Sequence, residues 1–165
     1  NENYDYDAQG NLWKKGTAGS ETVYTYLDSN HKHAVTHLGG APMYGYDPNG
    51  NMTTRKVDAT TYTQGWDAEN RLVTVSGTGL SSTFSYDGDG VRVKGTVNGA
   101  VTAYVSNWFE WTGSTSTMKK YYYAGAQRIA MRTGSGTGTS GLLWIIGDHL
   151  GSTTKIANYD GTINS

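Results

Sequence analysis

Residues 44–56 read YGYDPNGNMTTRK, and three other stretches of the chain are imperfect copies of this one. The copies are YDYDAQGNLWKKG from Tyr4, QGWDAENRLVTVS from Gln64 and FSYDGDGVRVKGT from Phe84. The aromatic residue before each aspartate stands at position 6, 46, 66 or 86, and Tyr26 occupies the missing register, so a period of 20 residues runs five times without a gap. A fixed short period of this kind is typical of a repeat architecture.

Each copy places the residues of a tight turn directly after its aromatic residue. In residues 47–50 (DPNG), Asp accepts backbone N–H bonds, Pro presets φ at the second place, and Gly closes the fourth. In the copy at 67–70, Asn replaces Gly, since Asn tolerates the left-handed backbone. Each copy therefore predicts a strand, a turn and a returning strand. The residues expected to shape these repeats are Tyr6, Asp7, Gly10, Tyr26, Tyr46, Asp47, Gly50, Trp66, Asp67, Asn70, Tyr86, Asp87 and Gly90.

A second turn in each period must lead the chain back into the next hairpin. Residues 57–60 (VDAT) and 76–79 (SGTG) stand at the right places for it. Two strands of about six residues and two turns of about four account for roughly 20 residues. The sequence therefore predicts an all-β fold, in which antiparallel hairpins pair edge to edge in a curved or spiralling sheet.

Beyond Gly90 the spacing loosens, although strand and turn signals continue. Residues 97–100 (VNGA) predict an Asn-Gly hairpin turn, and residues 124–127 (AGAQ) predict another turn between strands. Residues 134–141 (GSGTGTSG) predict a flexible loop, and LLWII at 142–146 predicts a final strand. We therefore expect hairpin repeats over 1–95 and a second β segment over 96–165, joined in one continuous sheet.

The composition excludes several classes of function. The net charge of −1 provides no broad field to attract nucleic acid or an anionic membrane. The absence of cysteine excludes disulfides, thiolate chemistry and Cys-based zinc sites. The longest apolar run, at 142–146, is far shorter than the roughly 20 residues of a membrane helix.

Tyr-Asp-x-x-Gly-Asn followed by an apolar residue resembles the YD repeat of Rhs proteins, wall-associated proteins and teneurins. His33–Thr36 (HAVT) and Asp67–Leu72 (DAENRL) have wordings common in that family. The segment from Tyr123 through Ile129–Arg132 to Asp148–Ser152 (DHLGS) resembles the Rhs core-associated segment. The likeness spans essentially the whole chain.

The resemblance implies a continuous sheet that spirals into a hollow shell around a variable C-terminal region, often a toxin. It implies that Asp148 satisfies turn amides and that Gly151 permits a bend. The chain starts and stops inside its own repeat pattern, so we expect it to be a segment of a longer secreted or cell-surface protein of bacterial type. We expect this segment to be structural and not an enzyme, with flanking repeats and an enclosed toxin or cargo as its partners.

The residues themselves agree with a thin wall. Alternation in LVTVS at 72–76 gives neither face a uniformly apolar character. Aromatic residues one period apart are expected to contact each other across neighbouring hairpins and to join them. A hairpin array also leaves an unpaired strand at each end, which invites pairing with another chain. Copies joined end to end would form a filament or tube, and a surface adhesin is the alternative function. Trp108, Phe109 and Trp111 are the candidates for stacking on a carbohydrate or other cell-surface ligand.

Four sharper interpretations compete with structural ones. His31, His33 and His37 share strand parity and could face one metal, but surface positions in the repeat are favoured. Residues 87–90 (DGDG) lack the later ligands of a calcium loop, and 134–138 (GSGTG) lacks the Gly-Lys-Ser/Thr of a phosphate loop. Asp148, His149 and Ser152 have triad residue types without a nucleophile elbow. We therefore predict no catalytic residue, metal or cofactor.

Overall fold

The computed structural model describes residues 1–164, and every helix or strand assigned within them is a β-strand. In the described part of the chain, therefore, no helix exists that could span a membrane. The chain divides into two compact units, one over Asn1–Thr83 and one that begins at Phe84. All strand pairs are antiparallel between chain neighbours, which confirms the predicted all-β array of hairpins.

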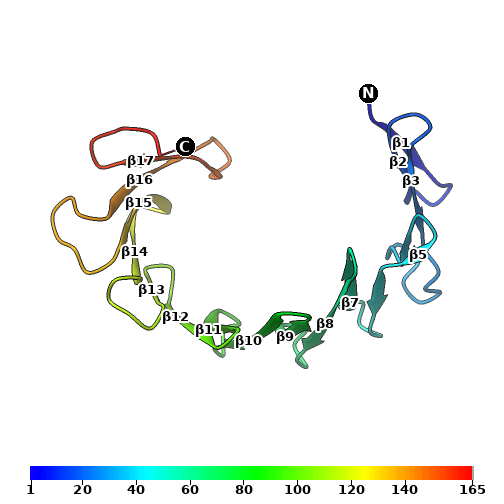
Figure 1. Ribbon diagram of the computed structural model, residues 1–165, viewed down its shortest axis with the longest axis horizontal. Coiled ribbons are helices and arrows are strands. Elements are labelled where there is room, and N and C mark those ends of the chain that lie inside the picture. The colour runs from blue at the N-terminus through cyan, green and yellow to red at the C-terminus, as the bar shows by residue number, and fades with distance from the viewer. Residues whose placement is uncertain (165) are drawn as a thin grey trace. The chain divides into compact units, whose positions relative to one another are not determined.

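The first unit contains a five-stranded sheet, whose first two strands form the copy at 4–16, and the first strands of a second sheet (Figure 1). The five-stranded sheet has the order β1 (Asn3–Tyr6), β2 (Leu12–Gly16), β3 (Thr22–Thr25), β4 (His37–Leu38) and β5 (Ala41–Pro42). The next sheet starts with β6 (Tyr44–Tyr46), β7 (Met52–Val57), β8 (Thr60–Trp66), β9 (Leu72–Gly77) and β10 (Leu80–Tyr86), paired in that order. The boundary between the two units falls within β10, after Thr83.

The expectation of one continuous sheet meets an interruption in this unit between β5 and β6. The strand β5 has only two residues, and one of them is Pro42, which has no N–H to donate to a ladder. The amides of Met43 and Tyr44 instead donate to the carbonyl of Thr36, at 2.9 and 3.1 Å.

The second unit continues the same antiparallel pattern. Its strands are β11 (Arg92–Val97), β12 (Ala100–Val105), β13 (Phe109–Trp111), β14 (Lys119–Ala124), β15 (Gln127–Thr133), β16 (Leu142–Gly147) and β17 (Thr153–Asn158). The prediction that LLWII forms the final strand is wrong, because β17 follows β16 and pairs with it from Leu143↔Asn158 to Gly147↔Thr153.

The register of the hairpins repeats with the sequence. Tyr6 pairs with Leu12, Tyr46 with Met52 and Trp66 with Leu72, and each ladder shifts by one residue just before its aromatic residue. The return turn predicted at 57–60 is confirmed by the pair Val57↔Thr60. The return turn predicted at 76–79 lies one residue later, between Gly77 and Leu80. The Asn-Gly turn is confirmed, since Val97 pairs with Ala100 and both central residues have positive φ.

The sheet has almost no interior. Among residues 1–164, the buried apolar side chains are Met118, Ala130 and Ala157, and no large side chain is fully buried. Large aromatic and aliphatic side chains stay exposed on many strands, including Trp13, Val101 and Trp144. The strands therefore form a single layer, and the turns and the contacts between hairpins must hold each strand in place.

Candidate functional site

The turn at residues 47–50 shows how one carboxylate organises a repeat. Asp47 Oδ1 accepts the amide N–H groups of Asn49 and Asn51, both at 2.9 Å. Asp47 Oδ2 accepts the side-chain amide of Asn51 at 3.0 Å. The Asp47 N–H donates to the Asn51 carbonyl, and the Gly50 N–H donates to the Asp47 carbonyl, each at 2.9 Å. The carboxylate thus satisfies amides that would otherwise have no partner in so short a turn.

The same arrangement recurs in four other turns. Asp7, Asp67, Asp87 and Asp148 each accept the amides of the residues two and four places later, at 2.8–3.0 Å. The fourth place has φ between 79° and 86° at Gly10, Gly50, Gly90 and Gly151. Asn70 takes that place in the turn at 67–70 with φ of 59°, the left-handed conformation that Asn tolerates.

Hydrogen bonding holds three of these carboxylates in their ionised form. The side-chain amide of Asn51 is the main cause that lowers the pKa of Asp47 below its ordinary value. The backbone N–H of Asn11 does the same for the pKa of Asp7. For Asp67, the backbone N–H of Arg71 comes first, and the Arg71 guanidinium, 2.8 Å from Asp67 Oδ2, lowers the pKa further.

A sixth turn escaped the sequence analysis. The Asn158 N–H donates to the Thr162 carbonyl at 2.8 Å, and the Gly161 N–H donates to the Asn158 carbonyl at 2.9 Å. Asn158 thus takes the place of the aspartate, and its side-chain amide donates to Thr162 Oγ1 at 2.9 Å. The visible Tyr-Asp pair at 159–160 lies one residue out of register, and an Asn-x-x-Gly search would have found the turn.

The register of Tyr26 lacks a turn of this kind, and the loop at residues 27–35 stands in its place. Asp28, two residues after the tyrosine, accepts the Asn30 N–H on Oδ1 at 2.9 Å. Its other oxygen, Oδ2, lies 2.9 Å from His31 Nδ1. The Leu27 N–H donates to Thr36 Oγ1 at 3.0 Å, which anchors the start of the loop.

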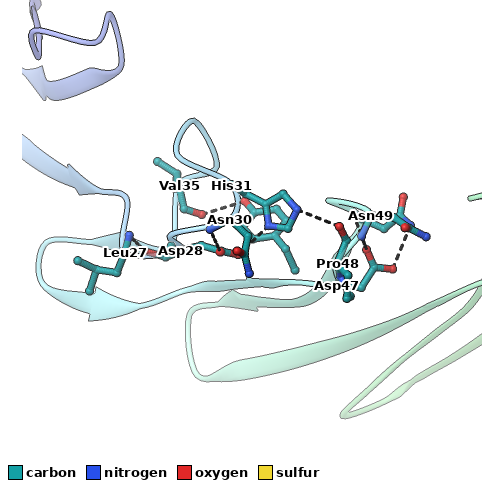
Figure 2. A network of polar contacts seen from close by, with 11 residues as sticks. Leu27, Asp28, Asn30, His31, Val35, Asp47, Pro48 and Asn49 are labelled. Carbon is teal, nitrogen blue, oxygen red and sulfur yellow. Dashed lines mark hydrogen bonds and ion pairs between the residues drawn. The ribbon is translucent and has the colours of Figure 1, made fainter.

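This loop connects the turns on either side of it. Toward the first turn, His33 Nδ1 lies 2.6 Å from Asn11 Oδ1, and Asn11 Nδ2 donates to the Lys32 carbonyl at 3.2 Å. Toward the next turn, His31 Nε2 lies 3.3 Å from the Pro48 carbonyl (Figure 2). Asn70 Oδ1 then accepts the side-chain amides of Asn49 and Asn51, at 3.1 and 2.7 Å. The turns at 7–10, 47–50 and 67–70 and the loop at 27–35 form one hydrogen-bonded series, which we call the turn row.

The in-step aromatic residues also join hairpins, but not by stacking their rings. Among Tyr6, Tyr26, Tyr46 and Trp66, the ring pair present in the described residues is that of Tyr46 with His31, with centroids 6.4 Å apart. The expected ring contacts are replaced by hydrogen bonds to backbone carbonyls of the preceding segment. These bonds run from Tyr26 Oη to the Leu12 carbonyl at 2.9 Å, from Tyr46 Oη to the Val35 carbonyl at 2.8 Å and from Trp66 Nε1 to the Met52 carbonyl at 2.9 Å.

The histidines are not brought to one point. His31 contacts Asp28 and Pro48, and His33 contacts Asn11, while His37 Nδ1 lies 2.9 Å from Thr36 Oγ1. Within residues 1–164, no group of three His, Cys, Asp or Glu side chains could hold a metal ion.

The segment DHLGS, at residues 148–152, forms a turn of the same kind as the YD copies. The Asp148 carboxylate accepts the amides of Leu150 and Ser152, both at 2.9 Å. Among the described residues, no hydrogen bond joins the His149 ring to either Asp148 or Ser152. The geometry is therefore that of the other aspartate turns rather than that of a catalytic triad.

The three aromatic residues proposed for ligand stacking differ in their surroundings. Trp108 is 55% exposed and packs edge-on against Tyr123, with ring centroids 4.7 Å apart. Phe109 and Trp111 lie on β13, where Phe109 is half-buried and Trp111 is exposed. Trp108 lies just before that strand. Phe109 and Trp111 stand two residues apart on β13 and therefore lie on the same face of it.

A network of charged and polar side chains beside β13 raises the pKa of one tyrosine, Tyr121. Tyr121 Oη donates to Glu110 Oε1 at 2.8 Å, and the Arg128 guanidinium lies 4.2 Å from the centre of the Tyr121 ring. Burial and the bond to Glu110 raise the pKa of Tyr121 to about 12. Lys119 completes the network, with Nζ 3.7 Å from Glu110 Oε2.

The glycine-rich loop at residues 134–141 is arranged around Arg132, a buried arginine that the sequence placed in the core-associated resemblance without a role of its own. Arg132, only 9% exposed, donates from Nη1 to the carbonyls of Gly136 and Ser140, at 3.0 and 2.8 Å. Its Nη2 donates to the Gly138 carbonyl, and its Nε donates to Tyr122 Oη at 3.2 Å. The loop predicted as flexible therefore wraps a guanidinium whose charge is met by neutral oxygen atoms.

No protein-family model matches the chain. Two curated proteins are similar to it in sequence. The tRNA3(Ser)-specific nuclease WapA of Bacillus spizizenii is 29% identical over 143 residues, and the tRNA nuclease WapA of Bacillus subtilis is 30% identical over 138 residues. The matches cover 81% and 73% of the chain, but the chain spans only 6% and 5% of the lengths of these relatives.

Solved structures of Tc toxins have a similar fold. The Photorhabdus luminescens Tc holotoxin pore with TccC3-D651A matches with a TM-score of 0.66 at 17% identity, and the crystal structure of TcdB2-TccC3-TEV with 0.64 at 19% identity. Each match covers 98% of this chain and 9% of the other. The similarity in sequence to the WapA proteins and in fold to the Tc toxin chains supports the resemblance to Rhs and YD-repeat proteins.

Proposed function

We propose that this chain is a non-catalytic segment of a longer, secreted or surface-exposed Rhs-like protein, and that its hairpins form part of a β-shell around a C-terminal cargo. The observation that carries the proposal is the single-layer sheet. Among residues 1–164 the buried apolar side chains are few and small, so the sheet is suited to be a wall rather than to enclose a core of its own.

The similar structures support the proposed wall, and the similar sequences support the proposed cargo. Both similar structures name TccC3, which one of them names together with TcdB2 and TEV, and the fold similarity extends over 98% of this chain. The similar curated proteins are named as tRNA nucleases and are much longer than the matched region. In the proposal, the nuclease activity of such proteins belongs to an enclosed region and not to the repeats.

The chemistry of the turns supports a structural role. One oxygen, Oδ1, of Asp47, Asp67 and Asp148 accepts two backbone amides in each case, so these carboxylates hold the chain in its turns. These aspartates therefore serve the fold.

The test is electron cryomicroscopy of the full protein that carries this chain, combined with limited proteolysis. We expect residues 1–164 in the wall of a hollow particle, and a C-terminal region that resists protease until the wall is cut. The purified chain alone should leave tRNA intact. A separate compact body, a regular fibre, or tRNA cleavage by the chain alone would overturn the proposal.

A further inference from the structure

One imidazole in the turn row contacts two groups that can only accept hydrogen bonds. His31 Nδ1 lies 2.9 Å from the Asp28 carboxylate, and His31 Nε2 lies 3.3 Å from the Pro48 carbonyl (Figure 2). A neutral imidazole has a single N–H, whereas the imidazolium has two. Both hydrogen bonds therefore form together only when His31 is protonated.

The bond from His31 to Pro48 crosses the interruption between the two sheets of the first unit, and the bond to Asp28 holds the imidazole within its own loop. Asp28 and His31 belong to the loop between β3 and β4 of the five-stranded sheet, and Pro48 belongs to the turn after β6. The strands β5 and β6 do not pair with each other. The other links nearby include Tyr46 Oη to the Val35 carbonyl at 2.8 Å and the Tyr44 amide to the Thr36 carbonyl at 3.1 Å.

We propose that His31 is a protonation-dependent latch, which fastens the five-stranded sheet to the sheet that begins at β6 and loosens this link when the imidazole loses a proton. Deprotonation leaves one N–H for two acceptors, so the loop at 27–35 keeps Asp28 or Pro48 but not both. The remaining contacts to Val35 and Thr36 do not titrate near neutral pH. Loss of the latch therefore loosens the junction without separating it.

The charged and titratable surroundings set the sign of the effect. Asp28 faces the imidazole from its own loop, and Asp47 and Tyr46 face it from β6 and the turn that follows. Lys32 and His33 follow in the loop, and His33 contacts Asn11 instead. The hydrogen bond to Asp28 is the main cause that raises the pKa of His31, and the same bond is the main cause that lowers the pKa of Asp28.

The two shifts define a pH window for the closed latch. Because the pKa of His31 is raised, the latch is fully formed below the ordinary histidine value of about 6.5 and is lost as the pH rises through the folded pKa. Because the pKa of Asp28 is lowered, its contribution is present above the ordinary value of about 3.9 and is lost as the pH falls through the folded pKa. In acid only the bond to Asp28 weakens, whereas the bond from Nε2 to Pro48, which joins the two sheets, is lost on the alkaline side of the window.

The test is an NMR titration of the isotope-labelled chain that follows the His31 ring nitrogens and the amide of Asn49, the peptide group that carries the Pro48 carbonyl. We expect His31 to titrate above the ordinary histidine value, and the Asn49 amide to shift with the same midpoint. Asp28→Asn keeps an oxygen for the Asn30 amide but removes the charge, so it should lower the pKa of His31. Asp5→Asn removes an exposed carboxylate elsewhere and should leave that pKa unchanged.

His31→Gln provides the second variant, since glutamine keeps a donor and does not titrate in this range. The transition of the Asn49 amide near neutral pH should vanish in this variant, while far-ultraviolet circular dichroism shows the sheet intact. The proposal is overturned if Asn49 does not follow His31 in the unchanged chain. It is equally overturned if Asp28→Asn and Asp5→Asn move the pKa of His31 by the same amount.

Discussion

The aspartate at the first place of a turn accepts two backbone amides with its carboxylate. Removing this carboxylate must leave the two amides exposed to water or without a partner. Asp87 accepts the amides of Asp89 and Val91, at 3.0 and 2.9 Å. The Asp89 side chain in the same turn makes no such bond among the described residues. Two aspartates in one turn thus carry the same charge and have different roles, which provides a matched pair for mutation.

Asp87→Ala should lower the thermal unfolding midpoint by roughly 2–4 °C, the shift that a loss of about 1 kcal/mol causes in a chain of this length. Asp89→Ala removes an equal charge without a hydrogen bond and should change the midpoint by less. Differential scanning calorimetry of both variants checks this. Equal shifts would show that charge, and not the amide bonds, stabilises the turn.

The turn carboxylates also predict how stability depends on pH. The pKa values of Asp7, Asp47 and Asp67 are lowered in the folded chain by the hydrogen bonds that they accept. Their contribution is therefore present above the ordinary aspartate value of about 3.9 and is lost as the pH falls through the folded values. Thermal unfolding followed from pH 2 to about 6.5, the ordinary histidine value, should show a constant midpoint above about pH 5 and a steep fall in acid. A midpoint that stays constant down to pH 2 would contradict the assignment.

Tyr121 extends the pH argument to the alkaline side. Burial and the bond to Glu110 raise the pKa of Tyr121 to about 12, so its contribution to stability is present below the ordinary value of about 10 and is lost as the pH rises through about 12. Tyrosine ring carbon NMR should place one phenol well above the ordinary value. Glu110→Gln should lower the pKa of Tyr121, and no change in that variant would exclude Glu110 as a cause.

At the scale of the element, the hairpins follow from the sequence where the motif is complete. The turn at 47–50, the left-handed Asn70 and the Asn-Gly turn at 97–100 all follow from backbone preferences of single residues. The turn at Asn158 did not follow, because Asn replaces Asp and a Tyr-Asp pair stands one residue later. The role of the loop at 27–35 did not follow either, since its partners Asn11 and Pro48 lie 17 to 22 residues away in sequence.

The glycine-rich loop gives the third case of a contact that no local pattern specifies. Residues 134–141 contain no apolar or charged side chain to mark a packing partner. Their order comes from backbone carbonyl oxygen atoms around Arg132. Sequence patterns are read from the types of side chain. The contacts of this loop are made by its backbone carbonyl groups, so no pattern of side chains could predict them.

Arg132→Gln should free this loop. Hydrogen bonds from a charged donor contribute about 1.5–3 kcal/mol each, so losing them should increase local opening by roughly tenfold or more. Limited proteolysis within residues 134–141, read by mass spectrometry, measures the opening. Arg128→Gln is the control, because Arg128 lies on the same strand and bonds to Tyr123 instead. Equal cleavage in both variants would contradict the role of Arg132.

At the scale of the whole molecule, stability has to come from neighbouring hairpins rather than from a common core. With Met118, Ala130 and Ala157 as the buried apolar side chains among residues 1–164, unfolding exposes little apolar surface for a chain of this length. Arrays of this kind are stabilised by each unit together with the interfaces to its two neighbours. The urea m-value should therefore be lower than that of a compact domain of 165 residues, as chemical denaturation would show. An m-value typical of a compact domain would indicate a core.

Amide hydrogen exchange, measured residue by residue by NMR, tests the stacked hairpins most directly. The account predicts slow exchange at the first-place amides, which donate to the carbonyl four residues later at Asp7, Asp47, Asp67, Asp87, Asp148 and Asn158. It predicts fast exchange at the second-place amides of Ala8, Ala68, Gly88 and His149. This contrast must recur in the copies at 7, 67 and 87, which lie on the 20-residue spacing, whereas the copy at 47 has Pro48, which lacks an amide, at its second place. Uniform exchange along these turns, or protection in unbroken helical runs across them, would contradict the account.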